Sequence, residues 1–204
     1  MRLMIAIPCG DVVRYEFAES LSKLQLALSE DGIDYDVKWL AGSLIYSARE
    51  ELASAAVEQG FSHILWLDSD MQFNRDLFNI LRAEDKPFVT GVYRSRRSPY
   101  AICLFTDTER AQRVLKLPNE PFEVQGCGFG CVLMETKIIK LVRAKYGCCF
   151  LPTREAGEDI AFCDRYRSVG GHIVAVPDAR ANHITYIPLR CDDPQKLVDY
   201  KEQR

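Results

Sequence analysis

The sequence predicts an α/β fold, and two observations carry this prediction. Short apolar runs of strand length alternate with amphipathic stretches of helix length over residues 3–93. Gly32 and Gly60 follow the first two helical stretches, where a glycine commonly ends a helix. Alternation at this spacing is typical of parallel strands joined by crossover helices. We therefore expect a parallel sheet in the first half of the chain.

The elements follow this alternation in order. The predicted strands of the first half cover 3–8, 35–42, 64–67 and 87–93, and the predicted helices cover 12–32, 47–60 and 74–85. The second half has short apolar runs at 100–105, 113–117 and 130–134, then a helix at 158–171 and a strand at 172–177. Because proline and glycine separate these runs, we expect an antiparallel or mixed extension of the same sheet.

Composition indicates one globular domain. The chain has 204 residues, of which 48% are hydrophobic and 27% charged, and no internal repeat or linker divides it. We expect residues 1–204 to form a single domain, with 186–204 as a loose polar tail. The first apolar run is too short for a signal peptide, and no segment reaches the length of a membrane span, so we expect a cytoplasmic protein.

Charge and cysteine content exclude few functions. A net charge of -3 gives no general attraction to nucleic acid or to an anionic membrane, and the basic cluster at 94–97 is interpreted as a solvated loop. The eight cysteines include no pair separated by two residues, so we expect most of them to be reduced and buried. A zinc site built from Cys127, Cys131 and a distant histidine is disfavoured for the same reason.

Two carboxylates follow the apolar strand at 64–67. Asp68 and Asp70 stand two residues apart, which places both side chains on one side of the sheet where the strand ends. Ligands of open α/β sheets bind at this edge, and a divalent cation such as Mg²⁺ or Mn²⁺ removes the repulsion between two such carboxylates. The alternative is that the aspartates form a turn or a helix cap.

Other candidate residues lie in the second half. Glu158 and Asp159 begin a predicted helix, where acidic side chains also complement the helix dipole without any catalytic role. His183 follows a predicted strand and is either a metal ligand or a partly buried polar ring. The glycines at 126, 128 and 130 either allow a substrate to approach the backbone or mark a bend in a strand.

In order along the chain, "WLDSDM", "VQGCGFGCVLM", "GEDIAFCDR" and "ANH" resemble motifs of the nucleotide-sugar-dependent glycosyltransferases of the GT-A fold, particularly small family-2-like members. The resemblance spans about residues 3–185. It implies a single-domain α/β fold, with a Rossmann-like mixed sheet flanked by helices. It also implies a metal-dependent enzyme of hexosyltransferase type, with Mn²⁺ or Mg²⁺ as cofactor and a UDP or GDP sugar as donor.

The resemblance also implies roles for individual residues. Asp70 and His183 match metal ligands, and Asp68 matches the aspartate that faces the ribose or the water shell of the metal. Asp159 matches the general base of inverting enzymes, with Glu158 beside it. Pro8 and Arg49 match residues that lie near the nucleotide base and the phosphates.

Two departures from the family pattern bear on the donor. The acidic "DDGS" that commonly follows the second strand is replaced by "AGSLIY", and Arg49 is followed by Glu50 where many relatives have asparagine. Both changes leave the nucleotide open. The acceptor is expected to be a saccharide or another hydroxyl-bearing molecule, a nucleic-acid acceptor stays open, and the oligomeric state is not predicted.

Three other classes of protein compete with this interpretation. A Rossmann dehydrogenase is excluded, because "PCGDVV" lacks the glycine fingerprint after the first strand. A phosphatase of the Asp-x-Asp type is a distant alternative, with Asp192 and Asp193 as its later acidic pair. A non-catalytic GT-A-like module that binds a nucleotide sugar or a glycan is the third, and turnover of the donor separates it from an enzyme.

Overall fold

The computed structural model describes residues 1–42 and 44–185, so the tail predicted at 186–204 lies outside the described residues. The helices are α1 (Tyr15–Glu30), α2 (Ile45–Glu58), α3 (Leu77–Arg82), α4 (Lys137–Tyr146) and α5 (Glu158–Arg167). The strands are β1 (Arg2–Cys9), β2 (Asp34–Ala41), β3 (His63–Leu67), β4 (Met71–Phe73), β5 (Phe88–Val92), β6 (Leu104–Asp107), β7 (Gln112–Arg113), β8 (Phe122–Val124), β9 (Gly126–Cys127), β10 (Cys131–Glu135) and β11 (Ile173–His183).

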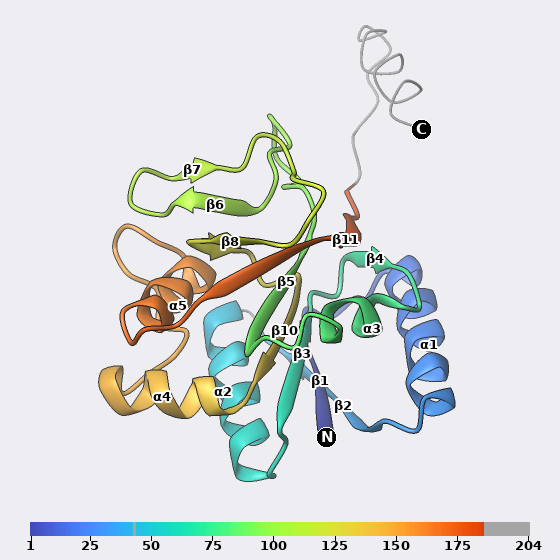
Figure 1. The fold of residues 1–204 in the computed structure, drawn as a ribbon. Coiled ribbons are helices and arrows are strands. Elements are labelled where there is room, and N and C mark those ends of the chain that lie inside the picture. Colours follow the sequence, from blue (N-terminus) through green and yellow to red (C-terminus); the bar gives the residue numbers. More distant parts are fainter. Residues whose placement is uncertain (43, 186–204) are drawn as a thin grey trace, which may run out of the picture.

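One mixed sheet organises the molecule (Figure 1). Its strands run in the order β2-β1-β3-β10-β5-β11-β4, and β8 pairs with β11. The pairs β1–β2, β1–β3 and β5–β11 are parallel, whereas β10 is antiparallel to both β3 and β5. A smaller sheet of β7, β6 and β9 lies beside it.

The position of β10 corrects the expected topology. The second half of the chain was expected to extend the sheet, but β10 is inserted between β3 and β5 in its middle. Its side chains are buried on both faces of the sheet. Val132 and Met134 lie in one apolar core, and Cys131 and Leu133 lie in the other. A strand that is apolar on both faces is stable only with neighbours and covering layers on both sides, which explains its central place.

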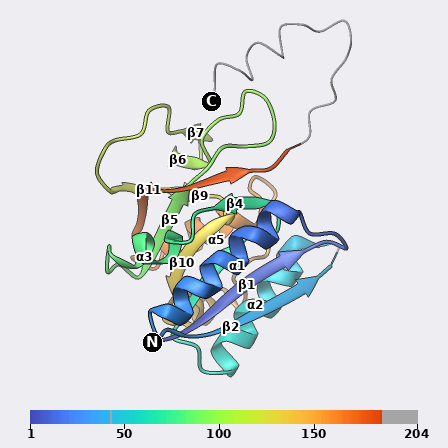
Figure 2. The same ribbon diagram turned by 90° about the vertical axis from the view of Figure 1, so that its right-hand side faces the viewer.

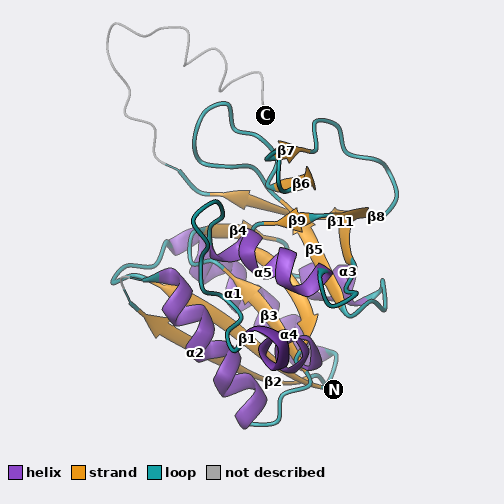
Figure 3. Ribbon diagram, turned by 90° about the vertical axis from the view of Figure 1, so that its left-hand side faces the viewer, coloured by secondary structure: helices purple, strands orange, loops and turns teal. Residues whose placement is uncertain are grey.

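Helices cover both faces of the sheet. The core that contains Met4, Ile64 and Trp66 is covered by α2, α4 and α5 (Figure 3). The opposite core contains Leu3 and Leu65 and is covered by α1 and α3 (Figure 2). The strands β1 and β3 thus alternate between two buried faces, as expected for the interior of a sheet covered by helices.

Sequence analysis missed helix α4 and the short strands β4, β8 and β9. Helix α4 buries Ile138, Ile139 and Val142 on one face and ends at Gly147, whose φ is 74°, so its amphipathic pattern and glycine stop were present in the sequence. Strand β4 has only three residues and is too short to give a pattern. It pairs with the end of β11, where Met71 is opposite His183, and this pairing brings Asp70 next to His183.

Glu50 has a structural role that accounts for one departure from the family pattern. Its carboxylate accepts hydrogen bonds from the backbone N–H groups of Cys149 (2.9 Å) and Phe150 (2.7 Å) and from the guanidinium of Arg143 (2.7 Å). The side chain therefore joins α2 to α4 and to the segment that follows it. Asparagine has only one acceptor oxygen and no charge, so it cannot replace all three contacts.

We predict that Glu50→Ala lowers the free energy of unfolding by about 2 to 4 kcal/mol, because two backbone donors and a guanidinium lose a charged acceptor. Urea denaturation measures this change. Glu51→Ala is the matched control, since Glu51 is exposed and lies next to Glu50 in the same turn of α2. Equal loss of stability in the two variants would contradict the structural role of Glu50.

Candidate functional site

A cavity of about 730 Å³ opens at the carboxyl ends of β1, β3 and β5. Its volume lies within the range of small-molecule and cofactor sites, and this edge of an α/β sheet is where such sites commonly form. Every site residue predicted from the sequence lines it. These residues are Pro8, Arg49, Asp68, Asp70, Glu158, Asp159 and His183.

Arg49 is the buried centre of the site. Its side chain, in the first turns of α2, is 3% exposed, and its Nη2 donates to Oδ1 of Asp68 at 2.7 Å. Its Nε lies 3.4 Å from Oε1 of Glu158 at the start of α5. The guanidinium also lies over the rings of Trp66 and Phe129, at 5.7 and 5.3 Å from their centroids. Burial lowers the pKa of Arg49, but the charges of the nearby carboxylates outweigh it and the net pKa is raised.

Two nitrogen atoms of this guanidinium are buried and make no hydrogen bond to the described residues. Nε lies 3.4 Å from Oε1 of Glu158 in an ion pair without a hydrogen bond, and the other atom is Nη1. An unpaired buried donor of a charged group is costly, and such groups in native proteins usually bind a ligand or a water molecule. Because these two atoms are closed to solvent, Arg49 acts on the cavity that it lines through its charge.

The two aspartates of "DSD" have different partners. The chain turns after β3, where the N–H of Met71 donates to the carbonyl of Asp68 at 3.1 Å, instead of continuing as a strand. Asp68 is held by Arg49, whereas Oδ2 of Asp70 lies 2.7 Å from Nη1 of Arg96 and 3.3 Å from Nε2 of His183. Both carboxylates line the cavity, but the turn separates their roles.

His183 has a polar partner at each ring nitrogen. Its Nδ1 lies 3.0 Å from the backbone carbonyl of Arg94, and since a carbonyl only accepts, Nδ1 carries a proton. Its Nε2 lies 3.3 Å from Oδ2 of Asp70. This is the arrangement of a metal-ligating histidine whose other nitrogen is fixed by a backbone carbonyl.

These two atoms fit a divalent cation as a partial ligand set. An oxygen of Asp70 and a nitrogen of His183 converge, and the part of the chain that the structure describes adds no third histidine, cysteine, aspartate or glutamate to form a full cluster. Mg²⁺ and Mn²⁺ are commonly held by one or two protein ligands, with substrate phosphates and water completing the shell. Metal binding by Asp68 stays a prediction, because its Oδ1 is bonded to Arg49.

Asp159 is a largely buried carboxylate whose pKa is raised. Burial and the nearby charge of Glu158 raise its pKa from 3.8 to about 6, although the charge of Arg49 opposes this shift. Oδ1 accepts a hydrogen bond from the N–H of Ile160 at 2.8 Å, and no cationic side chain of the described residues forms an ion pair with it. A carboxylate with a pKa near 6 is ionised at neutral pH and still accepts a proton readily.

The glycine-rich stretch makes room for Tyr93. A Cβ atom on Gly128 would lie 2.0 Å from the hydroxyl of Tyr93, and one on Gly130 would lie 2.9 Å from its ring. The hydroxyl of Tyr93 accepts a hydrogen bond from the N–H of Gly130 at 3.0 Å. The close approach that these two glycines permit is therefore to a side chain of the protein, which then forms part of the cavity wall.

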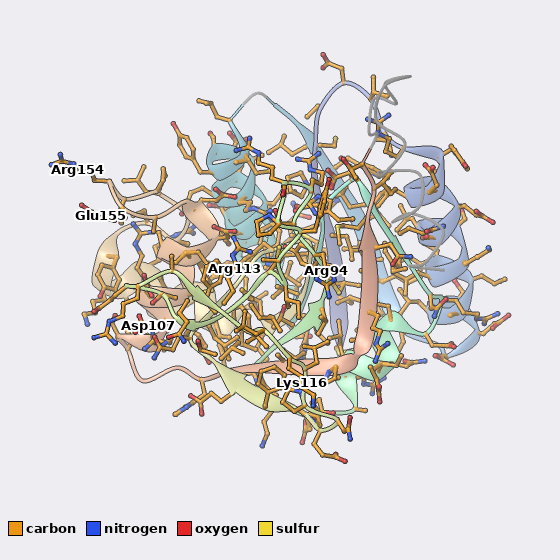
Figure 4. The ribbon with its side chains drawn as sticks, turned by 90° about the horizontal axis from the view of Figure 1, so that it is seen from above. Arg94, Asp107, Arg113, Lys116, Arg154 and Glu155 are labelled. Atoms are coloured by element: carbon orange, nitrogen blue, oxygen red, sulfur yellow. The ribbon has the colours of Figure 1, made fainter. Side chains whose placement is uncertain are left out.

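The interpretation of residues 94–97 as a solvated loop was wrong in part. Ser95, Arg96 and Arg97 line the cavity, together with Arg113 from β7. Seen from above, Arg94 and Arg113 lie over the middle of the molecule, whereas Arg154 and Glu155 project from its edge (Figure 4). The sequence contained an indication that these residues lie at the cavity. The cluster directly follows the strand that ends at Val92, so it begins at the same edge of the sheet as Asp68.

The alternative sites receive no support. Each of the seven cysteines among residues 1–42 and 44–185 is free, and that part of the chain contains no zinc-type cluster around Cys127 and Cys131. Asp192 and Asp193, on which the phosphatase alternative relied, lie outside the described residues. Among the described residues, no helix is long and apolar enough to span a membrane.

The arrangement of the sheet and its helices identifies the fold class. The mixed sheet flanked by helices is the GT-A fold, which confirms the fold class predicted from the sequence. No protein-family model matches the chain, and no relative among curated protein sequences does. The likeness is therefore one of structure, and the family-2-like assignment stays a prediction.

Three solved structures carry this likeness. A197 from STIV matches with a TM-score of 0.60 at 16% identity, over 94% of this chain and 98% of that one. GalNAc-T7 with UDP, GalNAc and Mn²⁺ matches with a TM-score of 0.58 at 11% identity, over 92% of this chain and 44% of that one. The catalytic domain of Drosophila β1,4-galactosyltransferase 7 in complex with xylobiose matches with a TM-score of 0.57 at 16% identity, over 98% of this chain and 78% of that one. At these identities the likeness shows the fold alone, and the chain spans less than half of the GalNAc-T7 chain.

We predict that Asp159→Asn stabilises the protein above pH 6. The folded-state pKa of about 6 exceeds the ordinary 3.8, so the ionised carboxylate destabilises the fold above pH 6 and this penalty disappears as the pH falls towards 3.8. The shift corresponds to on the order of 2 kcal/mol when the water of the cavity is allowed for. Urea denaturation of both proteins at pH 8 and pH 4 measures it. A stability gain of the variant that is no larger at pH 8 than at pH 4 would contradict the raised pKa.

Proposed function

We propose that the protein is a metal-dependent glycosyltransferase that moves a sugar from a nucleoside diphosphate sugar to an acceptor hydroxyl, with inversion at the anomeric carbon. The observation that carries this proposal is the presence, in one cavity, of the Asp70–His183 pair and of Asp159 with a pKa of about 6. A transferase needs both a cation site for the leaving diphosphate and a separate base for the acceptor.

The donor would occupy the side of the cavity lined by Pro8, Arg49 and Asp68. Asp70 and His183 would hold Mn²⁺ or Mg²⁺, which supplies positive charge to the oxygens of the leaving diphosphate. The positive charge of Arg49 beside the cavity supports an anionic donor there, and the bond of Asp68 to Arg49 would orient Asp68 for the ribose. The GalNAc-T7 structure contains UDP and Mn²⁺, which supports the same class of donor here.

The acceptor would approach Asp159. The carboxylate takes the proton of the acceptor hydroxyl as its oxygen forms a bond to the anomeric carbon, and the bond from that carbon to the diphosphate breaks on the opposite side. Glu158 does not need to react, since its ion pair with Arg49 fixes the start of α5 and its charge raises the pKa of Asp159. A saccharide is the acceptor class that we favour, and the xylobiose complex of the galactosyltransferase supports it.

We predict that UDP or GDP together with Mn²⁺ raises the melting temperature, and that chelation or Asp70→Asn abolishes the shift. A ligand at a hundredfold over its dissociation constant adds about 2.7 kcal/mol, or roughly 5 to 10 °C for a domain of this size. A thermal-shift panel of UDP, GDP and their sugars, with Mn²⁺, Mg²⁺ or chelator, measures this. Asp178→Asn, an exposed change on β11 outside the cavity, is the control. No metal-linked shift with any nucleotide would overturn the donor site.

We predict that Asp159→Asn lowers the transfer rate by at least about 100-fold with little change in donor affinity, because general-base catalysis contributes about 10² to 10⁴ in rate. Release of the nucleoside diphosphate in the presence of a saccharide panel gives the rate, and calorimetry gives the donor affinity. In the wild-type protein the rate should fall below about pH 6 as the base becomes protonated. Equal losses of rate and donor affinity would make Asp159 structural, and a product that retains the anomeric configuration would exclude the base role.

A further inference from the structure

The oxygen that a cation would bind on Asp70 already has a positively charged partner. Nη1 of Arg96 lies 2.7 Å from Oδ2 of Asp70, and Nε2 of His183 lies 3.3 Å from the same oxygen. The guanidinium of Arg96 therefore places a positive charge at the same carboxylate oxygen that a divalent cation would bind.

The segment that carries Arg96 is fixed at its base. The N–H of Ser95 donates to the carbonyl of Ala101 at 2.8 Å, and the N–H of Tyr100 donates to the carbonyl of Arg97 at 2.8 Å. This hairpin also fixes the metal-binding histidine, because the carbonyl of Arg94 accepts from His183. The same hairpin thus fixes the backbone position of Arg96 and the orientation of the His183 ring.

The side chain of Arg96 is much less restrained than its backbone. It is 54% exposed, and its only ion pair among the described residues is with Asp70. Exposed ion pairs are weak, because water screens them and ordering long side chains costs entropy. The guanidinium can therefore change its partner by rotation of its own side chain while the hairpin keeps its place.

The charges of the cavity favour such an exchange when metal and donor bind together. A divalent cation on Asp70 would lie next to a guanidinium, which repels it. The diphosphate of a nucleotide sugar carries two negative charges and, next to the cation site, would meet the carboxylate of Asp70. The cavity as a whole is lined by charges of both signs, four carboxylates and four guanidinium groups: Asp68, Asp70, Glu158, Asp159, Arg49, Arg96, Arg97 and Arg113. At the Arg96–Asp70 pair each ligand alone is thus opposed by one like charge, whereas both together add no net charge.

We propose that Arg96 exchanges Asp70 for the diphosphate of the donor when a divalent cation binds, and so couples the binding of metal to the binding of nucleotide. The proposal rests on the proposed function. Arg96 is then a donor-binding residue that also keeps the metal site closed to a cation without nucleotide. Arginine suits both partners, because its planar group binds carboxylate and phosphate oxygens alike.

The test is a binding cycle with Mn²⁺ and with UDP and GDP as probes, on the wild type and on Arg96→Gln. Free Mn²⁺ is measured by electron paramagnetic resonance, and nucleotide affinity by calorimetry. In the wild type, nucleotide should tighten Mn²⁺ binding by about 5- to 150-fold, the usual range of coupling between two sites, and Mn²⁺ should tighten nucleotide binding by the same factor. In Arg96→Gln, Mn²⁺ alone should bind about tenfold more tightly and the coupling factor should fall by a similar amount.

Arg97→Gln is the matched control. Arg97 has the same charge, lies in the same hairpin and lines the same cavity, but the structure records no ion pair between it and Asp70 among the described residues. This variant should leave the affinity for Mn²⁺ alone within about twofold of the wild type. Arg96→Lys keeps the charge and should retain part of the coupling, which separates loss of charge from loss of the planar group.

Each outcome decides the proposal. Unchanged affinity of Arg96→Gln for Mn²⁺ alone, or an equal gain in Arg97→Gln, would overturn the role of Arg96 at Asp70. Tighter Mn²⁺ binding with an unchanged coupling factor would overturn its transfer to the diphosphate. If the wild type binds Mn²⁺ together with UDP or GDP, but Arg96→Gln and Arg97→Gln have the same affinity for Mn²⁺ and the same coupling factor, only this proposal fails. If the wild type binds no Mn²⁺ with either nucleotide, the proposed function fails with it.

Discussion

The site depends on one buried cation. The guanidinium of Arg49 is 3% exposed and joins α2 to the end of β3 through Asp68 and to the start of α5 through Glu158. Burying a charge is favourable only where opposite charges and hydrogen bonds replace the lost water, so the three elements must meet at this point in a fixed arrangement. The position of Asp159, one residue after Glu158, follows from that constraint. A change of geometry at Arg49 would therefore alter the donor and acceptor sides of the cavity together.

The same constraint sets the electrostatics of the cavity. Four carboxylates line the cavity, and their mutual repulsion is relieved unequally. Asp68 and Glu158 are paired with Arg49, and Asp70 with Arg96. Burial and the charge of Glu158 raise the pKa of Asp159, with which no cation of the described residues forms an ion pair. Unequal pairing thus separates three carboxylates that have cationic partners from one whose pKa is raised. If Asp159 is the base that we propose, function and stability oppose one another at this residue.

Much of the fold and of the site was predictable because it depends on local patterns. Alternating apolar runs located β1, β2, β3 and β5, and glycines located the ends of α1 and α2. The predicted site residues converge because the carboxyl ends of parallel strands share one edge of the sheet. The central place of β10, the short strand β4 and the basic residues at 94–97 were not predicted. Each of these depends on pairing or packing between segments that are far apart in the sequence.

The sequence by itself determined the class of fold, the edge of the sheet that carries the cavity and the identity of its acidic residues, since these follow from hydrophobic period and from the positions at which strands end. Only the tertiary structure decided which partner each acidic residue has. The turn after β3 directs Asp68 to Arg49, and the pairing of β4 with β11 directs Asp70 to His183. The physical reason is that the charge state and the partner of a carboxylate are set by the atoms within a few ångströms of it, and here those atoms come from residues 19 to more than 100 positions away.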